Sequence, residues 1–186
     1  MGARSVHNLP VNRGFDYHFG FLGGGEHHFT QQSYECNEYV DLWENSAPAY
    51  SQNGTAYSCE LYGSKAVGHI ESHDASVPLF LYLAFHDVHE PNECPSKFFD
   101  PSIGFKPRQV AAGMSSCVSI ATGNVTDALK RQGMWNHTLM VWAADNGGLS
   151  LGTGNNFPLR GGKASNWSSC VLMTHTCVPT TIHVCL

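Results

Sequence analysis

An unbroken apolar stretch, Pro78-Leu79-Phe80-Leu81-Tyr82-Leu83-Ala84-Phe85, is followed abruptly by the polar pair His86-Asp87. A continuous apolar run of this length is typical of a strand that is buried on both faces of a sheet. A buried helix can contain the same short run, but the aromatic residues and the abrupt end favour a strand. We therefore predict a strand, buried on both faces, over residues 78–85.

A second buried strand is predicted at residues 138–144, and the region between the two strands is typical of a long helix from about Val110 to Gln132. The apolar residues of this helix form one stripe, at spacings typical of a helix face: Met114, Val118, Ala121, Val125 and Leu129. A strand, a helix and a second strand make a βαβ crossover. This order predicts an α/β fold with parallel strands that are neighbours or near neighbours.

The rest of the chain gives weaker signals. Residues 8–35 are rich in glycine and aromatic residues, which favours loops, and residues 36–56 are polar and predict a surface excursion. A helix is predicted from Tyr57 to about Ile70. The segment 168–186 has three cysteines and no Asp, Glu, Lys or Arg, and no helix or strand is assigned to it.

The composition is that of a folded protein, because 42% of the 186 residues are hydrophobic, enough for the core of one domain. A net charge of −5 without a basic block argues against nucleic-acid binding through phosphate neutralisation. No apolar run approaches the roughly 20 residues of a membrane span. Residues 1–13 lack the apolar core of a signal peptide.

Seven cysteines and four N-x-S/T sequons, at Asn53, Asn124, Asn136 and Asn166, are typical of a protein of the secretory pathway. We expect some of the cysteines to form disulfides and the others to be buried as apolar residues. A secretory protein without a signal peptide is a contradiction, which truncation of the N-terminus would resolve.

Two groups of polar residues follow the predicted strands, where ligands of α/β sheets gather. His89 comes just after the first strand and is predicted to donate a proton or to contact an anion. Asp145 and Asn146, in the turn 145–148, offer oxygen ligands that suit Ca²⁺ or Mg²⁺, although the same turn can be capped by its own side chains. The pair His27-His28 is expected on the surface or in a loop.

Arg160-Gly161-Gly162-Lys163 places two cations beside glycines that allow an anion to approach the backbone. Recognition of phosphate or sulfate and a solvated loop are both compatible with this pattern. Cys94-Pro95-Ser96-Lys97 has no base at a suitable spacing, so we interpret Cys94 as a structural residue rather than a nucleophile.

Six segments together resemble the sulfatase family, in one colinear order from about His7 to Trp167. They are Arg13-Gly14-Phe15-Asp16, residues 78–84, Val88-His89-Glu90-Pro91, Gly123-Asn124-Val125, Asp145-Asn146-Gly147-Gly148 and residues 155–163. The likeness is greatest to arylsulfatase B, N-acetylgalactosamine-4-sulfatase, and its near relatives. The resemblance implies an α/β fold, here a fragment of the alkaline-phosphatase-like sandwich with a mainly parallel sheet and flanking helices. It also implies a lysosomal or secreted glycoprotein that acts on a sulfated sugar, a glycosaminoglycan or an aryl sulfate.

Members of this family hydrolyse sulfuric esters with a formylglycine hydrate as nucleophile and one bound Ca²⁺, so the resemblance implies roles for four residues of this chain. Asp145 and Asn146 correspond to Ca²⁺ ligands. Lys163 would bind the sulfate and the leaving-group side, and His89 would contact the sulfate and protonate the departing alkoxide. A cation and a proton donor would stabilise the negative charge that develops on the bridging oxygen.

The chain also departs from the family pattern. The C-x-P-S-R motif, whose cysteine becomes formylglycine, is absent, and so is the upstream aspartate pair of the calcium site. We therefore expect a partial sulfatase catalytic domain over residues 1–167 and a divergent cysteine-rich tail over residues 168–186. With an incomplete calcium site, Ca²⁺ binding would be weak, and the isolated chain would be inactive.

Two alternatives stay open. One is a non-catalytic truncated or splice product without hydrolase activity. The other is a phosphatase or phosphodiesterase of the same superfamily, which would hold two zinc ions. The sequence leaves the oligomeric state open.

Overall fold

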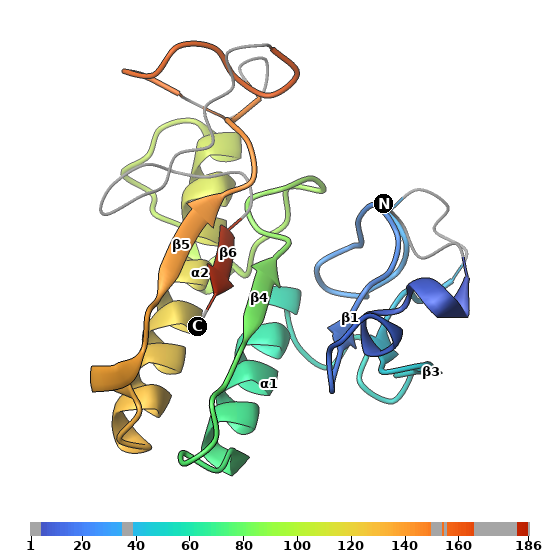
Figure 1. The fold of residues 1–186 in the computed structure, drawn as a ribbon. Coiled ribbons are helices and arrows are strands. Elements are labelled where there is room, and N and C mark those ends of the chain that lie inside the picture. The colour runs from blue at the N-terminus through green and yellow to red at the C-terminus, as the bar shows by residue number, and fades with distance from the viewer. Residues whose placement is uncertain (1–4, 35–38, 150–153, 155, 166–181, 186) are drawn as a thin grey trace.

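The computed structural model describes residues 5–34, 39–149, 154, 156–165 and 182–185. Figure 1 shows the chain, whose elements in order are η1 (Val6–Asn8), η2 (Pro10–Asn12), β1 (Phe19–Gly20), β2 (Trp43–Glu44), β3 (Ala47–Pro48), α1 (Ser58–Ser72), β4 (Tyr82–Phe85), η3 (Ser96–Phe98), α2 (Lys106–Arg131), η4 (Trp135–His137), β5 (Val141–Ala144) and β6 (Ile182–Cys185). Within these described ranges, neither long helix has the length and apolar character needed to cross a membrane.

The main sheet has the strand order β4-β6-β5, and β6 pairs antiparallel with both neighbours. β4 and β5 therefore run in the same direction, with α2 between them in the chain. This arrangement confirms the α/β fold and the near-neighbour crossover predicted from the sequence.

The strand pairing in this sheet differs from the expected parallel pairing. Val184 of β6 faces Leu83 of β4 on one side and Trp142 of β5 on the other, so both described ladders are antiparallel. No element was assigned to this segment from the sequence. Ile182 and Val184 are β-branched residues, which favour strands, but a four-residue strand is too short to show a clear period.

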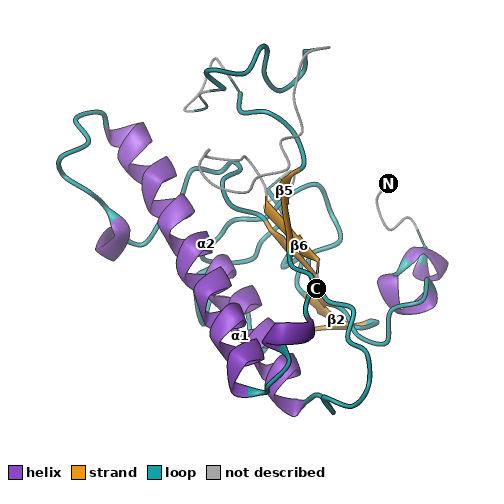
Figure 2. Cartoon of the chain, turned by 60° about the vertical axis from the view of Figure 1, so that its left-hand side comes forward, coloured by secondary structure: helices purple, strands orange, loops and turns teal. Residues whose placement is uncertain are grey.

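Both long helices lie on the same face of the main sheet, as Figures 1 and 2 show together. The apolar stripe predicted for α2 is fully or almost fully buried, which confirms the helix and its inward face: Met114, Val118, Ala121, Val125 and Leu129. All but Met114 of the stripe belong to one core cluster with Ile70 of α1 and with Leu83 and Phe85 of β4. The core therefore lies between the two helices and the sheet.

The prediction that the first strand is buried on both faces was wrong. In β4, Leu83 and Phe85 are buried, whereas Ala84 is exposed and Tyr82 is 48% exposed. Since both helices cover one face, side chains alternate between the core and the opposite face, as the pleat of a strand requires. Helix α2 also begins at Lys106, earlier than expected, because Pro107 is compatible with the first turn of a helix.

A small antiparallel sheet with the order β1-β2-β3 precedes α1. The segment between β1 and β2 reaches the start of α1, where the backbone N–H of Ser58 donates to the carbonyl of His28 across 2.8 Å. The backbone N–H of His28 donates in turn to Glu93 Oε2 across 2.9 Å. The N-terminal segment is thereby held beside the loop that follows β4.

The contact between α1 and α2 should depend on Gly63, because a Cβ added there would lie 2.9 Å from Cβ of Ala121. Gly68 of the same helix has no neighbouring atom within 4 Å of such a Cβ and provides a matched control. We expect Gly63→Ala to be less stable than Gly68→Ala by about 1–3 kcal/mol, the usual cost of overpacking. Urea unfolding followed by circular dichroism measures the difference. Equal stability of the two variants would contradict this packing.

Candidate active site

The loop after β4 carries the first candidate residue. His86, Asp87 and Val88 are buried, whereas His89 is half-buried and Glu90 is exposed. The backbone N–H of His89 donates to the carbonyl of His86 across 3.0 Å, which closes a turn directly after the strand. The imidazole of His89 therefore lies at the edge of the sheet, where it can meet both the interior and solvent.

The structure brings two of the predicted site residues, His89 and Lys163, into direct contact. Nδ1 of His89 lies 2.9 Å from the carbonyl oxygen of Glu90, so Nδ1 carries the proton and donates it. Nε2 of the ring then has a lone pair, which accepts a hydrogen bond from the Lys163 ammonium across 2.8 Å. This contact joins residues that are 74 positions apart in the sequence.

The turn after β5 is tied to the loop that carries Lys163. The backbone N–H of Lys163 donates to the carbonyl of Gly148 across 3.1 Å. The side-chain amide of Asn156 accepts from the Gly148 N–H across 2.7 Å and donates to the Gly148 carbonyl across 2.9 Å. A Cβ on Gly147 would lie 3.3 Å from Cα of Gly162, so glycine allows the two backbones to approach closely.

Asp145 and Asn146, the predicted metal ligands, lie in this turn. Asp145 is exposed and Asn146 is half-buried. Nδ2 of Asn146 donates to the carbonyl of Gly147 across 3.0 Å, so the turn is partly capped by its own side chain, as one of the two interpretations predicted. The carboxylate and amide oxygens are donors of the kind that suits a hard cation. Over the part of the chain that the structure describes, no group of three or more His, Cys, Asp or Glu residues could hold a metal ion.

The sequence that carries this site matches a known family. Residues 3–170 match the profile of the family described as Sulfatase. The chain belongs to the sulfatase family. The resemblance of its six sequence segments is thereby confirmed at the level of the family.

Named relatives agree with this assignment. The chain is 37% identical over 166 residues to arylsulfatase J of Mus musculus, 25% identical over 156 residues to the uncharacterized sulfatase YdeN of Escherichia coli (strain K12), and 30% identical over 98 residues to an arylsulfatase of Klebsiella aerogenes. These matches cover 86%, 82% and 48% of this chain. They cover 27%, 25% and 20% of the relatives, so this sulfatase chain spans about a quarter of their length. The finer likeness to arylsulfatase B stays a prediction.

Solved structures confirm the fold of this sulfatase chain. It is similar to the crystal structure of Ps i-CgsB with a TM-score of 0.76 and 26% identity, over 97% of this chain and 41% of that chain. The structure of Ps i-CgsB in complex with k-i-k-neocarrahexaose matches with a TM-score of 0.75 and the same coverage. The family assignment and these neighbours support a fragment of the alkaline-phosphatase-like fold.

The sulfatase chain buries its described free cysteines, Cys59, Cys94 and Cys117. This arrangement confirms that some cysteines serve as buried apolar residues. Sγ of Cys94 donates to the carbonyl of Pro95 across 3.4 Å, and burial raises the pKa of this thiol to about 12. Because the thiolate is the nucleophilic form, Cys94 is poorly suited to attack a substrate. Cys36, Cys170 and Cys177 lie outside the described residues.

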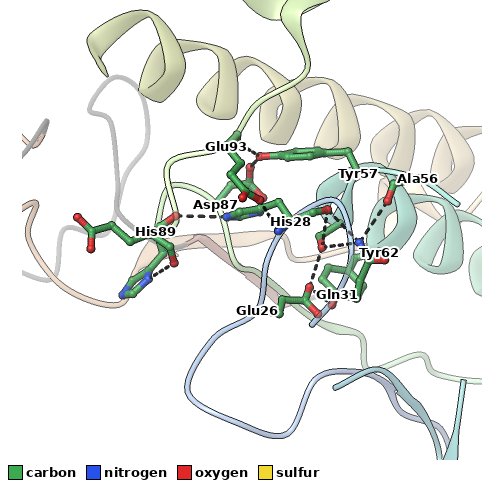
Figure 3. Close-up of polar contacts among 11 residues, drawn as sticks. Glu26, His28, Gln31, Ala56, Tyr57, Tyr62, Asp87, His89 and Glu93 are labelled. Carbon is green, nitrogen blue, oxygen red and sulfur yellow. Dashed lines mark hydrogen bonds and ion pairs between the residues drawn. The ribbon is translucent and has the colours of Figure 1, made fainter. Parts of the chain in front are cut away.

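Figure 3 shows a buried polar network behind His89, which the sequence did not reveal. The hydroxyls of Ser58 and Tyr62 donate to Oε1 of Glu26, the former across 2.7 Å. The hydroxyl of Tyr57 donates to Oδ1 of Asp87. His28, expected on the surface or in a loop, lies in a loop but is 0% exposed. The glycine-rich loop around His28 folds inward against α1 and gives no periodic signal.

Burial controls the charge of this network. It raises the pKa of Glu26 and that of Asp87, each to about 7. It lowers the pKa of His28 to about 4 and that of His86 to about 2. At neutral pH the two buried imidazoles behind His89 are therefore neutral.

The raised pKa of Glu26 predicts a pH-dependent cost in stability. A carboxyl whose pKa rises from 4.5 to about 7 on folding stabilises the fold fully below its unfolded pKa, and this contribution is lost as pH rises through about 7. We expect Glu26→Gln, which has no such proton to lose, to gain about 3 kcal/mol relative to the native chain between pH 4.5 and pH 8. His28, His86 and Asp87 are present in both proteins.

Urea unfolding at several pH values measures this difference, with Glu90→Gln at an exposed position as the control. Parallel stability profiles for the native chain and Glu26→Gln would show that burial does not perturb this carboxyl.

Proposed function

We propose that the site around His89 and Lys163 recognises sulfuric esters and belongs to a sulfuric ester hydrolase. The observation that carries this proposal is the 2.8 Å contact between the Lys163 ammonium and Nε2 of His89. A fixed cation beside an imidazole suits a tetrahedral anion, because the cation neutralises charge and the imidazole can exchange a proton. The family assignment supports the same class of substrate.

The hydrogen bonds support a different task for each group. Since Nδ1 of His89 donates to the Glu90 carbonyl, Nε2 is the atom that exchanges protons with a substrate. Without substrate, the Lys163 ammonium donates its hydrogen bond to Nε2. A bound sulfate would attract the ammonium toward the sulfate oxygens, which would leave Nε2 facing the bridging oxygen. Nε2 could then take up a proton from solvent and pass it to the alkoxide as the S–O bond breaks, which would return the ring to its neutral Nδ1–H form.

Asp145 and Asn146 would contribute oxygens to a bound cation, which we propose to be Ca²⁺. When bound, the ion would supply positive charge that polarises the sulfate oxygens. One carboxylate and one amide oxygen are a small part of the six to eight ligands that Ca²⁺ prefers. We therefore propose that the isolated chain binds Ca²⁺ weakly.

The isolated chain is proposed to bind sulfuric esters without turning them over. Its sequence contains no C-x-P-S-R motif, and burial of Cys94 disfavours the thiolate. The oligosaccharide complex of a structural neighbour supports a carbohydrate substrate, and the arylsulfatase relatives support an aryl sulfate as a probe. Location in lysosomes or outside the cell, and the division into residues 1–167 and a tail at 168–186, stay predictions.

Binding of an aryl sulfate tests the site directly. We expect 4-nitrophenyl sulfate to shift the NMR signals of the native chain, and Lys163→Gln and His89→Ala each to weaken binding about tenfold, the value of a hydrogen bond to a charged group. Lys130→Gln, on the exposed side of α2, is the matched control. Unchanged affinity in Lys163→Gln would remove the basis of the proposal. Release of 4-nitrophenol above the level of His89→Ala would show instead that the chain supplies a nucleophile. Zinc found by metal analysis would favour the phosphatase alternative.

Calcium titration tests the metal ligands. We expect a dissociation constant of about 1 mM or weaker, because the ligand set is small, and we expect Asp145→Asn to abolish the binding. Asp127→Asn, at an exposed carboxylate of α2, is the matched control. Isothermal titration calorimetry measures both. Tight binding that survives Asp145→Asn would place the cation elsewhere.

A further inference from the structure

Four aromatic rings form a stack that ends at the candidate proton donor. Tyr57 and His28 stack with ring centroids 5.3 Å apart, His28 and His86 with 4.5 Å, and His86 and His89 with 5.4 Å. The interplanar angles are 16°, 14° and 26°, so the rings are nearly parallel. Three of the four rings are buried, and His89 is the half-buried member that meets Lys163.

His28 also holds the backbone of His89. Nε2 of His28 donates to the carbonyl oxygen of His89 across 3.3 Å, which requires the Nε2–H form of a neutral imidazole. Nδ1 of His28 lies 3.7 Å from Oδ2 of Asp87, too far for a hydrogen bond. Asp87 is fixed by the Tyr57 hydroxyl, as Figure 3 shows. The stack against Tyr57 orients the His28 ring from the interior, and the hydrogen bond at Nε2 connects this ring to His89.

We propose that His28 is a positioning residue for His89, which it holds by the hydrogen bond to the His89 carbonyl and by the ring stack through His86. This inference rests on the proposed function, because it gives His89 a task that requires a fixed ring. An imidazole on an exposed loop samples several rotamers. Held at its carbonyl and against one ring face, the imidazole presents Nε2 to Lys163 and, by our proposal, to a substrate sulfate.

The surroundings of the stack keep positive charge at its outer end. The titratable groups that face it are Asp87, His27 and Glu93 beside His28, and Lys163 beside His89. Burial keeps His28 and His86 neutral at pH 7. A cationic His86 would repel the Lys163 ammonium, so the neutral stack is compatible with the contact between Lys163 and His89.

The test separates the hydrogen bond from the stack. His28→Phe keeps a ring but removes the donor to the His89 carbonyl, His28→Gln keeps a donor but removes the ring, and His86→Ala interrupts the stack. Nitrogen-15 NMR of the His89 ring reports its tautomer and its titration, and neither requires catalytic turnover. His73→Phe, at a histidine outside the stack, is the matched control.

In the native chain we expect one tautomer of His89, with the proton on Nδ1. We expect His28→Phe and His86→Ala to give mixed tautomers, a shifted titration midpoint and about tenfold weaker binding of 4-nitrophenyl sulfate. His28→Gln should restore part of the binding. If circular dichroism shows that His28→Phe does not fold, His86→Ala tests the same ring orientation.

Two results have different meanings. The positioning role alone would be overturned by the following result. The tautomer and the titration of His89 would be unchanged in His28→Phe and His86→Ala, and binding would be lost only in His89→Ala and Lys163→Gln. Loss of the fixed tautomer in these variants would support it, even if aryl sulfate binds none of the proteins and the proposed function fails.

Discussion

The hydrogen bond from the Lys163 ammonium to Nε2 of His89 joins the two halves of the candidate site. One half is the loop after β4, and the other is the turn after β5 with the loop that the carbonyl of Gly148 ties to it. An ammonium can donate to this nitrogen only while the imidazole is neutral and carries its proton on Nδ1. The carbonyl of Glu90 selects that tautomer, so a backbone group controls the contact on which the site depends.

The interior of this site and its rim differ in charge. Behind His89, burial opposes charge on carboxyls and imidazoles alike, and hydroxyl donors from Tyr57 and from α1 partly satisfy the carboxylates of Asp87 and Glu26. The ammonium of Lys163 lies at the rim. An anion that reaches the edge of the sheet would therefore meet positive charge there. The histidines of the buried network behind this edge are neutral.

The order of strand, helix and strand was predictable because each element has a local signal. The stripe on α2 repeats with the period of a helix, and the polar residues after β4 and β5 mark the ends of both strands. The buried polar network was not predictable. His28, Tyr57 and Asp87 come from three segments, and nothing near any of them in the sequence indicates that they meet. The one-sided burial of β4 was also hidden, since it depends on where both helices pack.

The central place of β6 bears on how the sheet assembles. Val184 pairs with Leu83, from which it is separated by 101 positions (184 − 83), while α1 and α2 form from neighbouring residues. Chain entropy opposes such distant closure, so topologies rich in long-range contacts fold slowly. The helices can therefore form and dock first. Until β6 pairs with them, β4 and β5 have unpaired hydrogen-bonding edges. During that interval the unpaired edges favour edge-to-edge association between chains.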